Sequence, residues 1–154
     1  METFNPDQIR SFLKKYSFFD LFNDEELDFL SHYGKLFKRD EGVVIAREGD
    51  IDTSFYVILL GSCAVLKQNS CLTILNPGDV FGEMGVISGQ PRSADVETRE
   101  PSLFLRIEGS ILEKTNLKFQ LKFYKKMTRI LIDRLAQTNK LNVFLAGRGK
   151  PRRS

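Results

Sequence analysis

Two residues of opposite charge, Glu83 and Arg92, lie within one short glycine-containing stretch at 81–94. The planar guanidinium of Arg92 can pair two oxygens of a phosphodiester, and a short helix beginning near Gly82 would add unpaired backbone N–H groups. A carboxylate beside such an arginine repels an anion unless the ligand also brings hydroxyl donors, such as a ribose 2′-OH. The stretch therefore predicts a site for a sugar phosphate that carries a single negative charge.

Smaller residues complete this predicted site. Gly82 and Gly85 lack side chains, so a ligand can approach the backbone closely. Ser93 offers a hydroxyl and an N–H on the arginine side, and Ala94 keeps the site tight. The predicted ligand-binding residues are Gly82, Glu83, Met84, Gly85, Arg92, Ser93 and Ala94.

The elements that must position this stretch are short and rich in β-formers from residue 35 onward. Turn residues separate them about every ten residues, which is typical of an antiparallel roll or barrel and not of βαβ units. The glycines of three turns, Gly49, Gly61 and Gly78, can take a positive φ without steric cost. The expected strands are 36–38, 43–46, 54–60, 62–67, 71–75, 94–98 and 103–107.

Helical patterns flank these strands. Asn5-Pro6 predicts a first helix over 6–15, because an N-cap is followed by proline at the first helical position. Asn23, followed by three acidic residues, predicts a second helix that stops at Gly34.

A long helix is expected after residue 108, capped by Thr115-Asn116 and ending near Gly147. Its apolar stripe is wider than a coiled-coil seam. Part of the stripe is expected to pack on the roll, and the remainder, especially 135–145, to face a partner or to cover the ligand. The stripe consists of Leu117, Leu121, Tyr124, Thr128, Leu131, Leu135, Thr138 and Leu145, with Phe123, Met127 and Ile130 beside them.

These elements predict a mainly β protein with flanking α-helices: an antiparallel, jelly-roll-like β-roll with short N-terminal helices and a long C-terminal helix. A length of 154 residues with 42% hydrophobic residues suits one domain with one packed core. Its expected parts are an N-terminal helical segment at 1–33, the roll at 34–108, C-terminal helices at 109–146 and a basic tail at 147–154.

Charge is distributed unevenly along the chain. Residues 109–154 contain twelve Lys and Arg against Glu113 and Asp133, a net charge of +10, whereas residues 1–108 have a net charge of −7. This asymmetry fits contact with nucleic acid, a membrane surface or an acidic partner. A solvated helix face with a frayed tail explains it equally well.

Other residue types exclude several classes of protein. Cys63 and Cys71 are expected to be reduced core thiols. The only histidine, His32, is expected to interact with carbonyls at a helix end, so no metal site is expected. No stretch approaches the roughly 18 apolar residues that span a bilayer, and a cytoplasmic protein is expected.

The stretch at 81–94 resembles the phosphate-binding cassette of the cyclic nucleotide-binding domain family. The core of that cassette is Phe-Gly-Glu and, nine residues after the Glu, Arg-Ser-Ala, which stand here at 81–83 and 92–94. The resemblance covers roughly residues 18–135. Stretches similar to the family's strand and turn signatures stand at 42–50, 55–61 and 75–79.

The resemblance implies roles for individual residues. Arg92 would bind the cyclic phosphate and Glu83 the ribose 2′-OH. The backbone amides that complete the cradle would be those of Gly82, Gly85, Ser93 and Ala94. Met84 and Gly85 depart from the family, which more often has Leu or Ile and then Ala; Gly85 weakens a short helix but leaves its amide available.

The resemblance does not decide the base. Ser93 can act as a phosphate ligand or can reach the guanine amino group, and cyclic AMP is favoured over cyclic GMP. The residue that covers the base is expected on the long helix, where Leu131, Arg134 and Leu135 are the candidates.

No P-loop, kinase signature or acid pair with a nucleophile accompanies the site, so a non-enzymatic sensor of cyclic AMP or cyclic GMP is expected, without a cofactor. Bound nucleotide is expected to favour one placement of the long helix, and so to change a contact with a second copy or an effector protein.

Two alternatives remain. A transcription regulator needs a DNA-reading unit after the long helix, where only 147–154 follow, so sequence-specific DNA binding is not expected. The other alternative is a partner-docking module in which the ligand is incidental.

Overall fold

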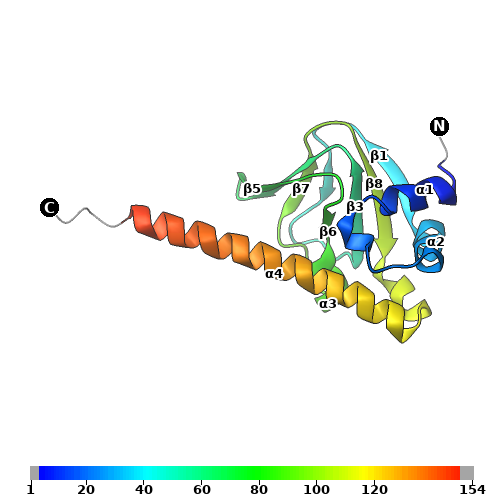
Figure 1. The fold of residues 1–154 in the computed structure, drawn as a ribbon. Coiled ribbons are helices and arrows are strands. Elements are labelled where there is room, and N and C mark those ends of the chain that lie inside the picture. Colours follow the sequence, from blue (N-terminus) through cyan, green and yellow to red (C-terminus); the bar gives the residue numbers. More distant parts are fainter. Residues whose placement is uncertain (1–3, 150–154) are drawn as a thin grey trace.

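The computed structural model describes residues 4–149 of the chain. Two four-stranded antiparallel sheets form a roll, one in the order β1-β8-β3-β6 and the other in the order β2-β7-β4-β5 (Figure 1). The strands are β1 Lys35–Arg39, β2 Val44–Ala46, β3 Ser54–Leu60, β4 Cys63–Lys67, β5 Ser70–Leu75, β6 Val80–Phe81, β7 Asp95–Thr98 and β8 Ser102–Glu108. The helices are α1 Pro6–Leu13, η1 Ser17–Phe19, α2 Asp24–Tyr33, α3 Glu83–Ser88, η2 Gly109–Lys114 and α4 Leu117–Arg148. The expected roll with short N-terminal helices and a long C-terminal helix is confirmed.

Seven strands lie within one residue of their expected bounds, because turn residues separate them. The turn glycines Gly49, Gly61 and Gly78 have φ values of 87°, 86° and 91°. β6 was not expected, since two residues are too few to show an alternating pattern. Its residue Phe81 pairs with Tyr56 of the central strand β3, and this pairing fixes the start of the cassette on the roll.

Both N-terminal helices begin with a capping box, in which an asparagine exchanges hydrogen bonds with the residue three positions later, Gln8 in α1 and Glu26 in α2. α1 ends at Leu13, two residues earlier than expected. The chain turns there into η1, which places two phenylalanines, Phe18 and Phe19, in the core.

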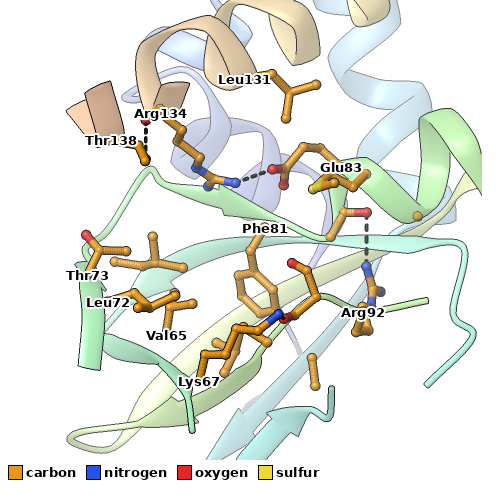
Figure 2. A pocket seen from close by; sticks show the side chains of 18 of the residues that line it. Val65, Lys67, Leu72, Thr73, Phe81, Glu83, Arg92, Leu131, Arg134 and Thr138 are labelled. Atoms are coloured by element: carbon orange, nitrogen blue, oxygen red, sulfur yellow. Dashed lines mark hydrogen bonds and ion pairs between the residues drawn. The ribbon is translucent and has the colours of Figure 1, made fainter. Parts of the chain in front are cut away.

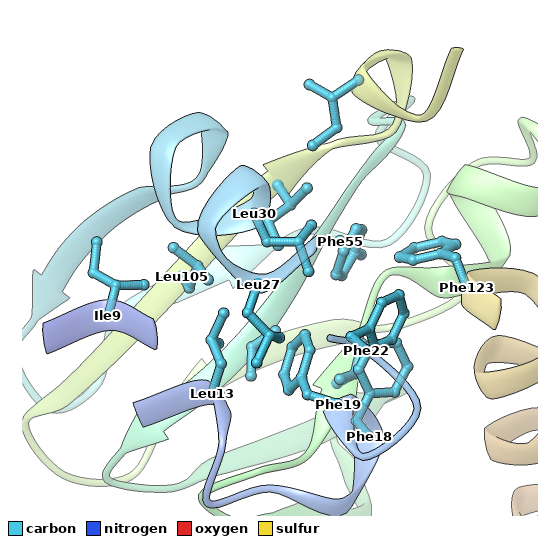
Figure 3. Close-up of a cluster of buried hydrophobic side chains, with 14 of the residues drawn as sticks. Ile9, Leu13, Phe18, Phe19, Phe22, Leu27, Leu30, Phe55, Leu105 and Phe123 are labelled. Carbon is cyan, nitrogen blue, oxygen red and sulfur yellow. The ribbon is translucent and has the colours of Figure 1, made fainter. Parts of the chain in front are cut away.

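The larger hydrophobic cluster lies between the N-terminal helices, the sheet that contains β3 and β8, and the beginning of α4 (Figure 3). Phe123 of α4 is fully buried in this cluster, with its ring 4.9 Å from that of Phe55 and 6.2 Å from that of Phe18. Such ring pairs stabilise a fold beyond the area they bury. A smaller cluster between the two sheets stacks Tyr56 on Phe81 at 4.9 Å, beside the cassette.

α4 packs on the roll through one of its two apolar faces. Phe119, Phe123 and Met127 are buried, whereas Leu117 and Leu121 are 81% and 70% exposed. Part of the wide apolar surface packs on the roll, as expected, and it does so through Phe123 and Met127, which lie beside the row that begins at Leu117 and Leu121. Two apolar faces lie side by side on this helix, and periodicity alone cannot tell which of them meets the roll.

Ion pairs with the N-terminal segment also hold α4 in place. The ammonium group of Lys122 lies 2.7 Å from the carboxylate of Glu26, and Lys126 pairs with Asp20. Part of the basic charge of this region is thus matched within the chain. The helix continues through Arg148, past the expected end near Gly147, and residues 150–154 of the predicted basic tail lie outside the described residues.

Both cysteines are free thiols, but only Cys63 is buried, and its burial raises the pKa of the thiol to about 11. Cys71 is exposed on β5, so the expectation of a second core thiol was wrong. As expected, His32 makes a helix-end contact, with Nδ1 2.8 Å from the carbonyl oxygen of Asp28. Within residues 4–149, no helix has the length and apolarity that a membrane crossing needs.

The orientation of α4 can be tested by truncating one residue on each face. Phe123→Ala should lower the free energy of unfolding by about 3–5 kcal/mol, because it leaves a cavity in the larger cluster. Leu117→Ala, on the exposed face, should change it by less than about 0.5 kcal/mol. Urea unfolding followed by circular dichroism measures both, and equal losses would contradict the observed orientation.

Candidate functional site

A pocket of about 510 Å³ opens between the β2-β7-β4-β5 sheet, the cassette and α4 (Figure 2). All seven predicted ligand-binding residues line it: Gly82, Glu83, Met84, Gly85, Arg92, Ser93 and Ala94. Strands provide an apolar floor, formed by Ala46, Val65, Leu72, Leu75 and Val96. α4 provides the roof, formed by Leu131, Arg134, Gln137, Thr138 and Leu141. The pocket thus has a polar end at the cassette and an apolar end between sheet and helix.

Gly82 and Gly85 serve the packing of the cassette itself. Gly82 has a φ of 88° and directly precedes α3. A Cβ on Gly82 would lie 2.5 Å from Nη1 of Arg92, and one on Gly85 would lie 2.5 Å from the carbonyl oxygen of Asp52. Sequence reasoning assigned these glycines to the close approach of a ligand, but the structure shows that the arginine and the neighbouring loop require them.

Arg92 is 8% exposed and is held from several sides. Its Nη1 donates to the carbonyl oxygen of Gly82 at 3.0 Å, and its Nη2 donates to that of Ser54 at 2.6 Å. The carboxylate of Asp52 pairs with the guanidinium at 3.0 Å, and the ring of Tyr56 lies 5.8 Å from it. Among the described residues, Nε of Arg92 has no hydrogen-bond partner. The guanidinium is therefore fixed in place with one buried donor still available.

Asp52 anchors this arginine. Burial alone would raise the pKa of Asp52, but hydrogen bonds from Ser54 and the interaction with Arg92 outweigh it and lower the pKa to about 2. The hydroxyl of Tyr56 also donates to Asp52 at 3.0 Å. The carboxylate is therefore ionised at neutral pH, and it orients Arg92 without exposing it.

Glu83, the first residue of α3, is 3% exposed. One of its oxygens, Oε1, pairs with Nη1 of Arg134 from α4 (Figure 2). Nη2 of Arg134 donates to the carbonyl oxygen of Val80. The other oxygen, Oε2, is buried without a hydrogen-bond partner within the described chain. A buried acceptor without a partner is costly, so this oxygen can accept from a hydroxyl that enters the pocket.

Sequence reasoning treated Arg134 only as a candidate to cover the base, and its contact with Glu83 was missed. The signal was present, because Arg134 lies seven residues after the buried Met127 and so shares its side of the helix. Leu131, another candidate, also lines the pocket. Leu135 does not line it and is 62% exposed, and which residue covers the base stays a prediction.

Lys67 is a pocket residue that sequence reasoning did not select. It follows Val65 on the inner side of β4, where strand alternation places both side chains toward the pocket. Its ammonium group donates to the backbone carbonyl of Ser93 at 2.9 Å and lies 3.3 Å from the carboxylate of Glu48. Alternation along 63–67 was the available signal. Between residues 4 and 149, no group of His, Cys, Asp and Glu side chains is arranged to hold a metal ion.

A family model for the cyclic nucleotide-binding domain matches residues 37–115. The chain is 29% identical over 137 residues to a cGMP-dependent protein kinase of Plasmodium berghei, a match that covers 82% of this chain and 16% of the kinase. It is 32% identical over 95 residues to a cGMP-dependent protein kinase of Toxoplasma gondii, covering 62% of this chain and 10% of the kinase. The chain therefore spans a small part of the length of these relatives.

Solved structures share the fold. A cyclic nucleotide-binding domain from Methylobacillus flagellatus superposes with a TM-score of 0.75 at 23% identity, covering 88% of this chain and 80% of that one. The catabolite activator protein of Thermus thermophilus superposes with a TM-score of 0.72 at 22% identity, and the match covers 84% of this chain and 62% of that one. The regulatory domain of Toxoplasma gondii PKA with cAMP superposes with a TM-score of 0.70 at 22% identity, and the match covers 80% of this chain and 50% of that one.

The role of Asp52 predicts a pH-dependent effect on stability. Because its folded pKa is depressed from 3.8 to about 2, its stabilisation is fully present above pH 3.8 and is lost as the pH falls toward 2. Asp52→Asn should lower the free energy of unfolding by about 1 kcal/mol near neutral pH. Urea unfolding across this pH range should show the difference from wild type shrinking below about pH 4. A difference independent of pH would contradict the assignment.

Proposed function

Because the chain belongs to the cyclic nucleotide-binding domain family, we propose that it is a cyclic-nucleotide sensor that binds its ligand in the pocket between cassette and α4. The observation that carries this proposal is a pair of buried groups of opposite charge in one pocket, each with one unpartnered polar atom: Nε of Arg92 and Oε2 of Glu83. A cyclic nucleotide offers both complements, since it has one anionic phosphate and a ribose hydroxyl that can donate.

The cassette residues then take distinct roles. The donor at Nε of Arg92 binds a phosphate oxygen in a charge-assisted hydrogen bond, while Asp52 keeps the arginine from moving. Oε2 of Glu83 accepts from the ribose 2′-OH. Backbone amides of Gly85, Ser93 and Ala94, with Met84 at the rim, complete the proposed contacts.

The apolar end of the pocket suits a purine. Its floor carries Val65 and Leu72 from two strands, and its roof carries Leu131 from α4. A volume of about 510 Å³ falls within the range of about 300–1,000 Å³ typical of small-molecule sites. The preference for cyclic AMP over cyclic GMP stays a prediction: the kinase relatives bear cGMP in their names, whereas the PKA structure contains cAMP.

Binding is coupled to α4 through Glu83 in this proposal. Arg134 joins α4 to one oxygen of that carboxylate and to the backbone at Val80. A ligand hydroxyl on the second oxygen withdraws charge from the first and weakens the contact with Arg134. Bound nucleotide then favours a different placement of α4, which is a population shift between two arrangements of the helix.

We assign this domain a binding role and not a catalytic one, in keeping with the expectation from the sequence. The charged groups around the pocket are committed to each other: Asp52 to Arg92, and Glu83 to Arg134. Neither pair is arranged with a nucleophile that it could activate. A cytoplasmic location likewise remains a prediction.

Calorimetric titration with cyclic AMP and with cyclic GMP tests the sensor. Wild type should bind at least one of them, and Arg92→Ala should lose about 10- to 150-fold in affinity, the value of a charge-assisted hydrogen bond of about 1.5–3 kcal/mol. Arg129→Ala is the matched control, because that exposed arginine lies outside the pocket and should leave affinity unchanged.

Arg92→Lys is a second variant, in case Arg92→Ala does not fold. It retains the positive charge without the planar guanidinium and should also weaken binding. Circular dichroism confirms that each variant is folded. The absence of heat with either nucleotide in folded wild type would overturn the sensor proposal.

A further inference from the structure

Two of the cations that line the pocket are already paired with carboxylates. Asp52 lies 3.0 Å from the guanidinium of Arg92, and Glu83 pairs with Arg134. Arg106 also approaches Asp52, at 3.7 Å, but it does not line the pocket. The polar end of the pocket therefore offers hydrogen-bond donors to an anionic ligand but little net positive charge.

Lys67 of β4 is the third cation in the pocket lining, counted over residues 4–149. Its side chain extends from the floor into the pocket (Figure 2), and Nζ donates to the carbonyl oxygen of Ser93 at 2.9 Å. Its ion pair with Glu48 is longer, 3.3 Å, and the two side chains are 42% and 47% exposed. An ion pair with this exposure contributes little to stability, so the ammonium group can exchange Glu48 for another anion.

Glu48 is held beside the cassette by the backbone of its turn. The N–H of Glu48 donates to Oδ1 of Asp95 at 2.7 Å. In the same turn, the N–H of Gly49 donates to the carbonyl oxygen of Arg92, and the N–H of Arg92 donates to that of Asp50, both at 2.8 Å. The Glu48 carboxylate therefore stays close to the cassette although it does not line the pocket.

We propose that Lys67 is a second cation for the phosphate of the nucleotide. When the ligand enters, the ammonium group leaves Glu48 and donates to the exocyclic phosphate oxygen that Arg92 does not bind, while it keeps its hydrogen bond to Ser93. Glu48 is then a competing anion that lowers the affinity for the ligand. This role rests on the proposed function of the pocket.

The position of Lys67 favours the phosphate over the base as its partner. A lysine ammonium group has three donors, and one of them already reaches Ser93, whose amide belongs to the proposed phosphate cradle. The end of the pocket that suits a purine is apolar, with Val65, Leu72 and Leu131 around it. An ammonium group is strongly hydrated, so a place among those side chains would cost it hydration free energy.

Calorimetric titration of Lys67→Gln tests this role with each cyclic nucleotide that wild type binds. The glutamine amide can still donate to Ser93 but carries no charge, so affinity should fall about 3- to 10-fold. The loss should shrink at high salt, because salt screens the charge of the partly exposed lysine. Lys67→Arg retains the charge and should recover most of the affinity. Equal affinity of wild type and Lys67→Gln would overturn the inference.

Glu48→Gln should act in the opposite direction. Without the competing carboxylate, affinity should rise about 2- to 5-fold. The same substitution in a Lys67→Gln background should bring no gain, because the lysine for which Glu48 competes is absent. A loss of affinity in Glu48→Gln, or an equal gain in both backgrounds, would contradict the competition.

The two phosphorothioate diastereomers of the bound nucleotide probe the phosphate directly. Each replaces one exocyclic oxygen with sulfur, which is a weaker acceptor. Because Lys67 and Arg92 are assigned to different oxygens, the ratio of the two affinities should change about threefold or more in Lys67→Gln. An unchanged ratio would overturn the phosphate contact.

Lys14→Gln is the matched control for both measurements. Lys14 is 50% exposed, also pairs with a carboxylate, that of Asp24 at 2.7 Å, and lies outside the pocket. This variant should leave the affinity and the diastereomer ratio unchanged. Wild type that binds neither nucleotide would overturn the sensor proposal and this role together, whereas wild type that binds as tightly as Lys67→Gln would overturn this role alone.

Discussion

Glu83 is a buried carboxylate, only 3% exposed. Burial of such an ion costs several kcal/mol of hydration free energy, which a paired charge and hydrogen bonds must offset. Arg134 supplies that compensation from α4, fifty-one positions away in the sequence. The contact joins three parts of the molecule, because the same arginine also bonds the backbone of β6 at Val80. The placement of the long helix is thereby tied to the contacts of one carboxylate.

The cassette satisfies a second burial constraint in the same pocket. Arg92 is buried only because Asp52, Ser54 and the carbonyl of Gly82 surround its guanidinium. That crowding explains the glycines, since a Cβ at Gly82 or Gly85 would collide with the arginine or with the neighbouring backbone. The polar end of the pocket is thus organised before any ligand enters, which reduces the entropy that binding must remove.

Local patterns predicted every strand except β6, the two asparagine N-caps and the seven cassette residues that line the pocket. Turn glycines, caps and the Glu–Arg spacing act over short distances in the chain. Local patterns could not predict contacts between segments that are distant in the sequence. The partner of Glu83 depends on how α4 crosses the roll. That crossing depends in turn on Phe123 meeting Phe55, which the spacing of apolar residues on a two-faced helix could not decide.

In the proposed function, Arg134 couples α4 to the cassette, and bound nucleotide changes the placement of the helix. The account can be tested by pulsed electron spin resonance between a label on the exposed Cys71 of β5 and one on Lys140→Cys, diluted into excess unlabelled protein. Saturating nucleotide should shift the distance distribution in the wild-type background and leave it unchanged in Arg92→Ala. An unchanged distribution in protein that calorimetry shows to be fully bound would contradict the coupling of the ligand to the helix.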